Sequence, residues 1–202
     1  MTARDYLKKN LNVPNVLTMI RLFLVPVYLI LYLNGKKYEA LAVFLLASFT
    51  DLLDGQIARK YNLITDFGKL MDPFADKVMV LAVVYSMTVG SAYVPPVIPM
   101  SALIIILVKE LMMMIGGFVM MKKGIVVYSN MLGKVAHCVF IASLVAIYFH
   151  DWFVKDFAGW PMTPDLMLLW LAVGISLCAM VNYTRQGLIK MKAVQSPTAN
   201  ES

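Results

Sequence analysis

The chain has 202 residues, of which 60% are hydrophobic and 15% charged, and its mean hydropathy is +0.74. The charged fraction lies well below the roughly 25% of soluble domains, which excludes an ordinary soluble globular protein. A net charge of +6 on so apolar a chain indicates contact with anionic lipids and not with nucleic acid. The length allows one domain, which we expect over residues 1–192.

The N-terminal segment, residues 2–13, is predicted to form a short amphipathic helix on the membrane surface. It alternates basic side chains, among them Arg4, Lys8 and Lys9, with aromatic and aliphatic ones. Such helices lie in the plane of the interface with their apolar face against the acyl chains. A solvated tail is the alternative.

Long apolar runs predict an all-α integral membrane protein with six transmembrane helices. Each run is long enough to cross the hydrocarbon core as a helix. The predicted spans are 16–33, 38–59, 67–90, 96–121, 127–149 and 166–188. Residues 150–165 form the longest predicted loop, and the polar residues 193–202 are predicted to be a disordered tail.

The distribution of positive charges favours an orientation with both termini in the cytoplasm. Most loop Lys and Arg residues then lie inside, and Lys36, Lys37 and Lys155 lie outside. Trp152 and Trp160 fall near the outer boundary, where aromatic residues gather. We therefore expect a multi-pass protein of the cell membrane, with the acidic segment described next at its cytoplasmic face.

Four aspartates lie on two consecutive predicted helices within residues 51–76. Asp51 and Asp54 share a helix face at a spacing of three, and Asp72 and Asp76 share one at a spacing of four. Four carboxylates brought together repel one another and need cations to stay ionised. Since hard oxygen ligands suit Mg²⁺ or Mn²⁺, the pattern predicts a divalent metal site. The alternative is that these acids are solvated or paired with neighbouring basic side chains.

The whole pattern over residues 51–76 reads D-x2-D-G-x2-A-R-x8-G-x3-D-x3-D. It resembles the signature of the CDP-alcohol phosphotransferases, membrane enzymes in which an alcohol displaces CMP from a CDP-linked donor. Residues 14–26 resemble the N-x2-T-x2-R segment of the bacterial phospholipid synthases of that family. Beyond the N-terminal part of the chain, the resemblance is mainly one of hydropathy.

This resemblance implies a role for each residue of the two segments. Two Mg²⁺ or Mn²⁺ ions would be held by Asp51, Asp54, Asp72 and Asp76, and Asp76 would also be the general base on the acceptor hydroxyl. The implied donor-binding residues are Asn15, Thr18, Arg21, Asp54, Gly55, Ala58, Arg59 and Gly68. Taken alone, Asn15 would be a helix cap and Arg21 a snorkelling arginine. A homodimer is also implied by the resemblance.

The predicted acceptor contacts are Lys109, Lys134 and His137. Lys109 and Glu110 lie in the middle of the fourth predicted span, roughly 20 Å from its end, where charges are costly unless they face a polar cavity. Lysines facing one cavity would suit an acceptor that carries a phosphate. Charge balance between Lys109 and Glu110, and a packing role for His137, are the alternatives.

The resemblance is greatest to bacterial phosphatidylglycerophosphate synthases, which implies transfer from CDP-diacylglycerol to glycerol 3-phosphate. Those enzymes carry Gly-Lys-x-Lys-Thr in the fifth span, whereas residues 133–137 of this chain read Gly-Lys-Val-Ala-His. Loss of the second lysine leaves phosphatidylglycerol open as the acceptor, which would make the protein a cardiolipin synthase. A cation transporter is a remoter alternative, because transport predicts charges on several well-separated spans.

Overall fold

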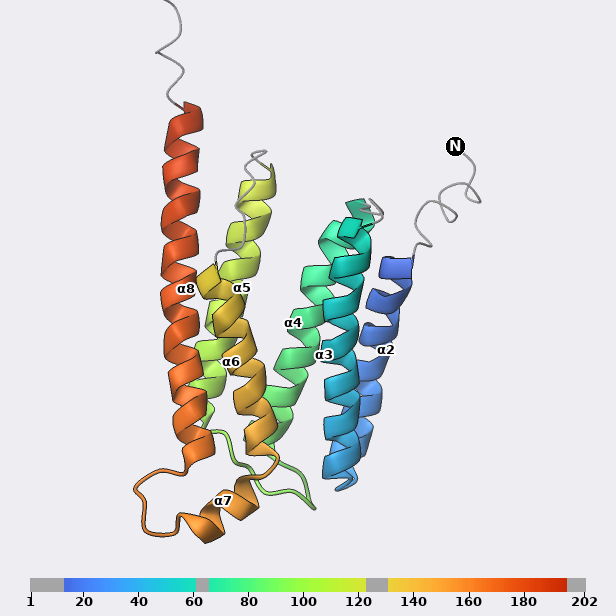
Figure 1. Ribbon diagram of the computed structural model, residues 1–202, viewed down its shortest axis with the longest axis vertical. Helices are drawn as coiled ribbons and strands as arrows, with labels where there is room; N and C mark the ends of the chain where they lie inside the picture. Colours follow the sequence, from blue (N-terminus) through green and yellow to red (C-terminus); the bar gives the residue numbers. More distant parts are fainter. Residues whose placement is uncertain (1–12, 61–65, 123–130, 196–202) are drawn as a thin grey trace, which may run out of the picture. The chain divides into compact units, whose positions relative to one another are not determined.

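The computed structural model describes residues 13–60, 66–122 and 131–195, which form helices joined by turns and contain no strand (Figure 1). The helices are α2 (Val13–Leu33), α3 (Lys37–Lys60), α4 (Asp66–Val89), α5 (Met100–Lys122), α6 (Met131–Ile147), α7 (His150–Asp156) and α8 (Pro164–Gln195). The chain divides into two compact units, unit 1 (Met1–Pro99) and unit 2 (Met100–Ser202). Apart from Val13, the predicted interfacial helix 2–13 lies outside the described residues.

Three of the described helices are long and apolar enough to cross a membrane. These candidates are Asn15–Leu33 in α2, Met100–Met120 in α5 and Pro164–Met191 in α8. A broken span formed by α6 and α7 would be a fourth. The protein is therefore a multi-pass integral membrane protein by the character of its helices. Each of the six predicted spans overlaps one described helix, but spanning by α3, α4 and α6 stays a prediction.

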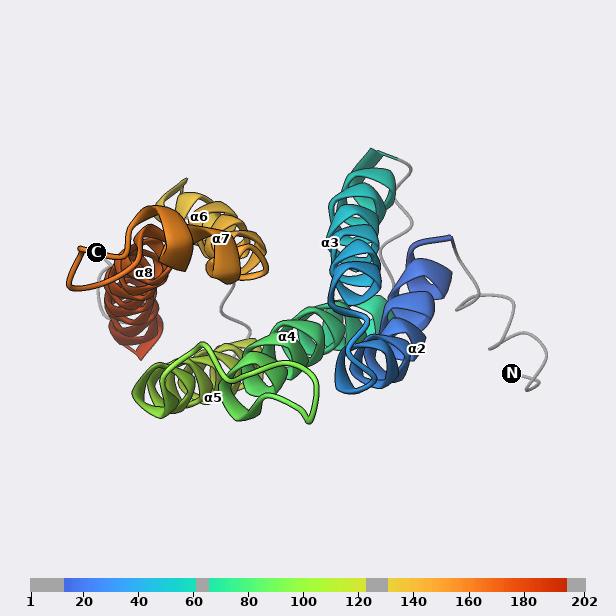
Figure 2. The ribbon, with the colours of Figure 1, turned by 90° about the horizontal axis from the view of Figure 1, so that it is seen from below.

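Unit 1 is built around α2, which packs against both α3 and α4, as the view in Figure 2 shows. Its buried residues recur every three or four positions, so that each helix turns one apolar stripe inward. The stripes comprise Val25, Tyr28 and Tyr32 on α2, Ala40, Phe44 and Ala47 on α3, and Val80, Val83 and Met87 on α4. Contact along these stripes sets the register in which the three helices meet.

A hydrogen bond between Tyr28 and Ser86 crosses this apolar interior. The Tyr28 hydroxyl lies 2.9 Å from Ser86 Oγ, and Ser86 Oγ donates to the carbonyl of Val83 at 2.9 Å. Since serine has a single O–H, the Tyr28 hydroxyl donates to Ser86. The hydrogen bond therefore ties α2 to α4 in the middle of unit 1.

Tyr28→Phe should lower the stability of the protein by about 1 kcal/mol, the usual net contribution of one hydrogen bond. Ser86 keeps its bond to the Val83 carbonyl, so the change leaves no buried donor unpaired on that side chain. Thermal unfolding of the purified protein in detergent measures the effect. An unchanged melting temperature would show that this contact adds nothing.

A turn at Asn34 and Gly35 joins α2 to α3, and its backbone conformation explains the glycine. Gly35 has φ +78°, and a Cβ there would lie 2.7 Å from Cβ of Tyr93. Its N–H donates to the carbonyl of Tyr32 at 3.0 Å, and the Asn34 side chain donates to the carbonyl of Ile30 at 2.7 Å. Glycine is therefore required there by both conformation and space.

In unit 2, α8 packs against α5, α6 and α7. The prediction of a loop over residues 150–165 is wrong in its first half, because residues 150–156 form α7, bent by 74° from α6. His150 Nδ1 lies 2.7 Å from Oδ2 of Asp165, whose side chain is fully buried at the start of α8. This contact holds α7 to α8, which local sequence patterns cannot indicate.

The last helix is also longer than predicted. Residues 166–188 were expected to span and 193–202 to be disordered, but α8 runs from Pro164 to Gln195. Its 32 residues measure about 48 Å, whereas the hydrocarbon core is about 30 Å thick. Helix α8 therefore extends beyond the hydrocarbon, and Arg185 and Lys190 lie in its C-terminal part. Residues 196–202 lie outside the described part of the chain.

Candidate active site

The apolar stripes of unit 1 become polar toward one end. On α2, Arg21 lies four residues before Val25, and on α3, Asp51 lies four residues after Ala47. On α4, Asp76 lies four residues before the buried Val80. Because positions four apart share a helix face, the packing that buries the apolar core also brings these charged side chains inward. The site therefore lies on the same helix faces as the apolar core, with charged side chains in place of apolar ones.

Arg21 and Asp51 form a buried ion pair between α2 and α3. Arg21 Nη1 lies 2.7 Å from Asp51 Oδ1, and the Arg21 side chain is only 1% exposed. The Asp51 side chain is 28% exposed, so one part of the carboxylate is covered and another reaches solvent. A guanidinium taken out of water needs an opposite charge at short distance, which Asp51 supplies.

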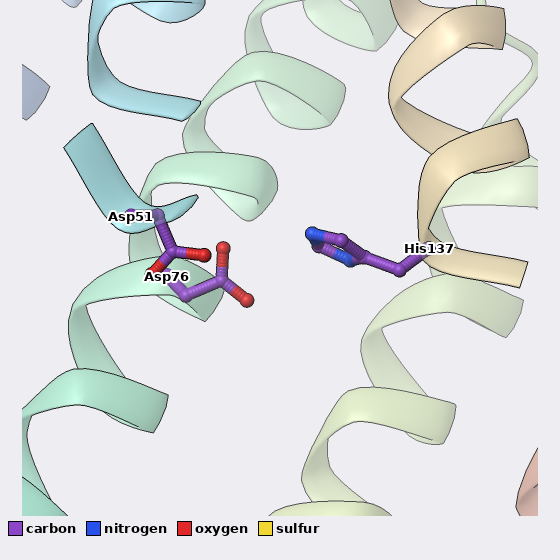
Figure 3. Close-up of side chains that lie close together, drawn as sticks. All are labelled: Asp51, Asp76 and His137. Carbon is purple, nitrogen blue, oxygen red and sulfur yellow. The ribbon is translucent and has the colours of Figure 1, made fainter. Parts of the chain in front are cut away.

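Asp51 and Asp76 lie next to each other across α3 and α4 (Figure 3), with carboxylate oxygens within 4.8 Å. An ion that takes oxygen ligands at 2.0–2.1 Å holds opposite ligands about 4 Å apart. Two partly exposed carboxylates at this separation therefore fit a hard divalent cation with little adjustment. His137, the third side chain drawn in Figure 3, belongs to α6 of unit 2.

The remaining donor-side and metal-site predictions fall on the same three helices. Asn15 and Thr18 are buried on α2, on the face of Arg21, with exposures of 4% and 1%. The others lie in α3 (Asp54, Gly55, Ala58 and Arg59) or in α4 (Gly68 and Asp72), and their side chains are outside the described part of the structure. Among the described residues, the structure brings together Arg21, Asp51 and Asp76.

The predicted acceptor residues lie on α5 and α6 of unit 2. Lys109 pairs with Glu110, and its Nζ lies 5.7 Å from the centre of the Phe140 ring. This is the charge balance that the sequence left open as an alternative, supported by a cation–π contact. Lys134 is exposed on α6 and His137 is half-buried. The part of these residues in acceptor binding stays a prediction.

The contact between Arg21 and Asp51 was not predicted. The family resemblance implied that Arg21 is a donor-binding residue, and its spacing of three from Thr18 places both on a common helix face. An arginine that is buried in a helix bundle needs a carboxylate close to its guanidinium. This requirement is the property of the sequence from which an ion pair of Arg21 with one of the aspartates could have been predicted. Which aspartate supplies it depends on how α2 packs on α3.

The sequence is similar to a known protein family and to several individual proteins. A sequence model of the family described as CDP-alcohol phosphatidyltransferase matches residues 11–179. A Rickettsia typhi protein named CDP-diacylglycerol–glycerol-3-phosphate 3-phosphatidyltransferase is 53% identical over 73 residues, which cover 34% of this chain and 40% of that relative. A Bacillus subtilis protein of the same name is 31% identical over 177 residues, or 80% of this chain and 88% of the relative.

A third relative has a different name. A Streptomyces coelicolor protein named Cardiolipin synthase (CMP-forming) is 31% identical over 175 residues, covering 76% of this chain and 77% of the relative. The Rickettsia alignment is confined to a segment less than half as long as either protein. The family match and the Bacillus alignment, in contrast, both extend over most of the chain. With its acidic motif on α3 and α4, the chain belongs to the CDP-alcohol phosphatidyltransferase family.

Proposed function

We propose that the protein transfers the phosphatidyl group of CDP-diacylglycerol to glycerol 3-phosphate, releasing CMP and forming phosphatidylglycerophosphate. The observation that carries this proposal is the meeting of the Asp51 and Asp76 carboxylates at the polar end of unit 1. Two relatives, one of them aligned over 88% of its length, bear the name of this activity. The acidic site supports a metal-dependent transfer reaction, and the names of these relatives suggest the donor and the acceptor.

In the proposed reaction, a hydroxyl oxygen of the acceptor attacks the phosphorus that carries the diacylglycerol. The bond from this phosphorus to the CMP oxygen breaks, and its electron pair leaves with CMP. Asp76 takes the proton of the attacking hydroxyl as the general base. Its half-buried carboxylate is accessible to a substrate while α4 holds it in place.

The donor would be held at the same end of unit 1. Asp51, Asp54, Asp72 and Asp76 are the residues that would hold two Mg²⁺ or Mn²⁺ ions, which neutralise diphosphate charge when bound. Arg59 would bind the phosphates, and Asn15 and Thr18 would contact the donor from α2. The small residues Gly55, Ala58 and Gly68 would leave room for cytidine beside the helices.

The acceptor would be bound by Lys109, Lys134 and His137 of unit 2. Lys134→Ala should raise the KM for glycerol 3-phosphate roughly 10-fold or more, the loss expected for a hydrogen bond to a charged group. The KM for CDP-diacylglycerol should stay nearly constant. Steady-state kinetics with each substrate varied separately measures both values.

Lys155→Ala is the matched control for this prediction. Lys155 is an exposed lysine on α7, outside every predicted substrate contact, so its removal should change neither KM. If Lys134→Ala raised both KM values equally, Lys134 would be no acceptor contact.

A screen of acceptors tests the function itself. Purified protein is given labelled CDP-diacylglycerol with either glycerol 3-phosphate or phosphatidylglycerol, and the lipid product is identified. We expect phosphatidylglycerophosphate from the first acceptor. Cardiolipin from the second, with no reaction of the first, would replace the proposal by cardiolipin synthesis, which the Streptomyces relative favours.

We further propose that all six long helices span the cytoplasmic membrane, with both termini and the acidic site inside. The excess of basic residues on that side and the extension of α8 support this orientation. Single cysteines are introduced at Lys155 and Lys190 in a background without Cys138 and Cys178. An impermeant maleimide should label position 155 in intact cells and position 190 only after permeabilisation.

The two units would act together as one domain over residues 1–192, and the protein would be a homodimer. A family model that runs from residue 11 to 179 includes most of both units, which supports a single domain. The dimer follows from family resemblance. Light scattering in detergent gives the protein mass, and a monomer at all concentrations would contradict the dimer.

A further inference from the structure

The buried ion pair between Arg21 and Asp51 has the geometry of a device that orients a metal ligand. We propose that Arg21 is a positioning residue, which holds the Asp51 carboxylate ready to bind the divalent ion. This inference rests on the metal site of the proposed function and assigns Arg21 a role other than contact with the donor. It names a residue of α2 as part of a site whose acids lie on α3 and α4.

The first argument is the contact itself. Arg21 Nη1 lies 2.7 Å from Oδ1 of Asp51. A carboxylate has two oxygens with about four lone-pair positions, so it can contact a guanidinium and bind a metal ion at the same time. The attraction of opposite charges at this distance favours the orientation of the Asp51 side chain that keeps Oδ1 beside the guanidinium. Arg21 thereby selects one orientation of the carboxylate that stands next to Asp76.

The second argument is burial. Only 1% of the Arg21 side chain is exposed, whereas 28% of Asp51 is. A side chain that binds donor phosphates must present N–H groups to the space that the donor enters. Arg21 lies on the buried face of α2 together with Thr18 and Val25. The partly exposed Asp51 is therefore the member of the ion pair that a ligand can reach.

The third argument is charge. The carboxylates of Asp51 and Asp76 have oxygens within 4.8 Å and repel each other before any cation binds. The positive guanidinium beside Asp51 offsets part of this repulsion. Removing a group that hydrogen-bonds or pairs with a metal ligand typically lowers metal affinity or activity 10- to 100-fold. We expect a loss of metal affinity of this size when Arg21 is replaced.

The experiment measures Mn²⁺ binding by electron paramagnetic resonance on the purified protein in nanodiscs, without any CDP-lipid. Arg21→Gln should weaken Mn²⁺ binding roughly 10- to 100-fold. Arg21→Lys keeps the charge but loses the planar fork, so its loss should be smaller, about 3- to 10-fold. Tyr28→Phe is the control, because it removes a buried polar contact from the same face of α2 and should bind Mn²⁺ like the wild type.

Two results would overturn the inference. Wild-type Mn²⁺ affinity in Arg21→Gln with a raised KM for CDP-diacylglycerol would make Arg21 a donor contact. Wild-type affinity with only a lower melting temperature would make its role structural. Should Arg21→Gln fail to fold, Arg21→Lys decides alone, and Mn²⁺ affinity equal to that of the wild type would reject the positioning role.

The inference and the proposed function can fail separately. If the wild type binds Mn²⁺ in an Arg21-dependent way but releases no CMP with either acceptor, the proposed function is wrong and the positioning role stands. If the wild type releases CMP while Arg21 variants bind Mn²⁺ normally, only the positioning role is wrong. A wild type that binds no Mn²⁺ would contradict the metal site on which both depend.

Discussion

Replacing Asp76 by asparagine is expected to lower the rate of CMP release by roughly 10²- to 10⁴-fold, the usual contribution of a general base. The amide has nearly the same shape as the carboxylate but cannot take the proton of the attacking hydroxyl. The helix and its packing should be unaffected, because the amide fills the same half-buried space on α4 as the carboxylate. The assay follows CMP released from labelled CDP-diacylglycerol in the presence of glycerol 3-phosphate.

Asp156→Asn provides the matched control, since it makes the same chemical change at an exposed aspartate at the end of α7. It should leave the rate unchanged. Binding of CDP-diacylglycerol by Asp76→Asn should remain measurable, so that the defect lies in the chemical step. Turnover at the wild-type rate in Asp76→Asn would remove this residue from the role of base.

Asp51→Asn is expected to reduce both activity and stability, in contrast to Asp76→Asn. It removes the charge that faces the buried guanidinium of Arg21 at 2.7 Å. Breaking a buried ion pair on one side costs roughly 3–5 kcal/mol, and the 28% exposure of Asp51 places the expected loss near the lower end. Thermal unfolding in detergent should show a clear decrease in melting temperature, and metal-dependent CMP release should be lost.

A double variant separates the two effects of Asp51. Asp51→Asn combined with Arg21→Gln replaces the charged pair by two neutral amides, which should recover much of the stability but none of the activity. A double variant as unstable as Asp51→Asn alone would show that the ion pair is not the source of the loss. Activity that survives in chelator would contradict the metal site.

Much of the fold could be predicted from the sequence, because helices in an apolar solvent follow from the length of apolar runs. The predicted spans 16–33 and 38–59 lie within a few residues of α2 and α3. Helix α7 was missed, since seven residues are too few to show a helical period. It is held to α8 by His150 and Asp165, which are 15 residues apart in the chain.

The site could be predicted in composition but only partly in arrangement. Spacings of three and four along one helix are local, so the pairing of Asp51 with Asp54 and of Asp72 with Asp76 on common faces follows from the sequence. The ion pair of Arg21 with Asp51 joins residues of different helices, and its existence depends on the register of α2 on α3.

The sequence by itself determined that this is a helical membrane protein with an acidic motif of the CDP-alcohol phosphatidyltransferases. Both conclusions rest on properties that repeat along the chain, namely hydropathy and fixed spacing. Only the tertiary structure decided that the partner of the buried Arg21 is Asp51, which lies on another helix. The physical reason is that an ion excluded from water is stabilised by whichever opposite charge packing brings within about 3 Å, and packing is a property of helix faces in contact.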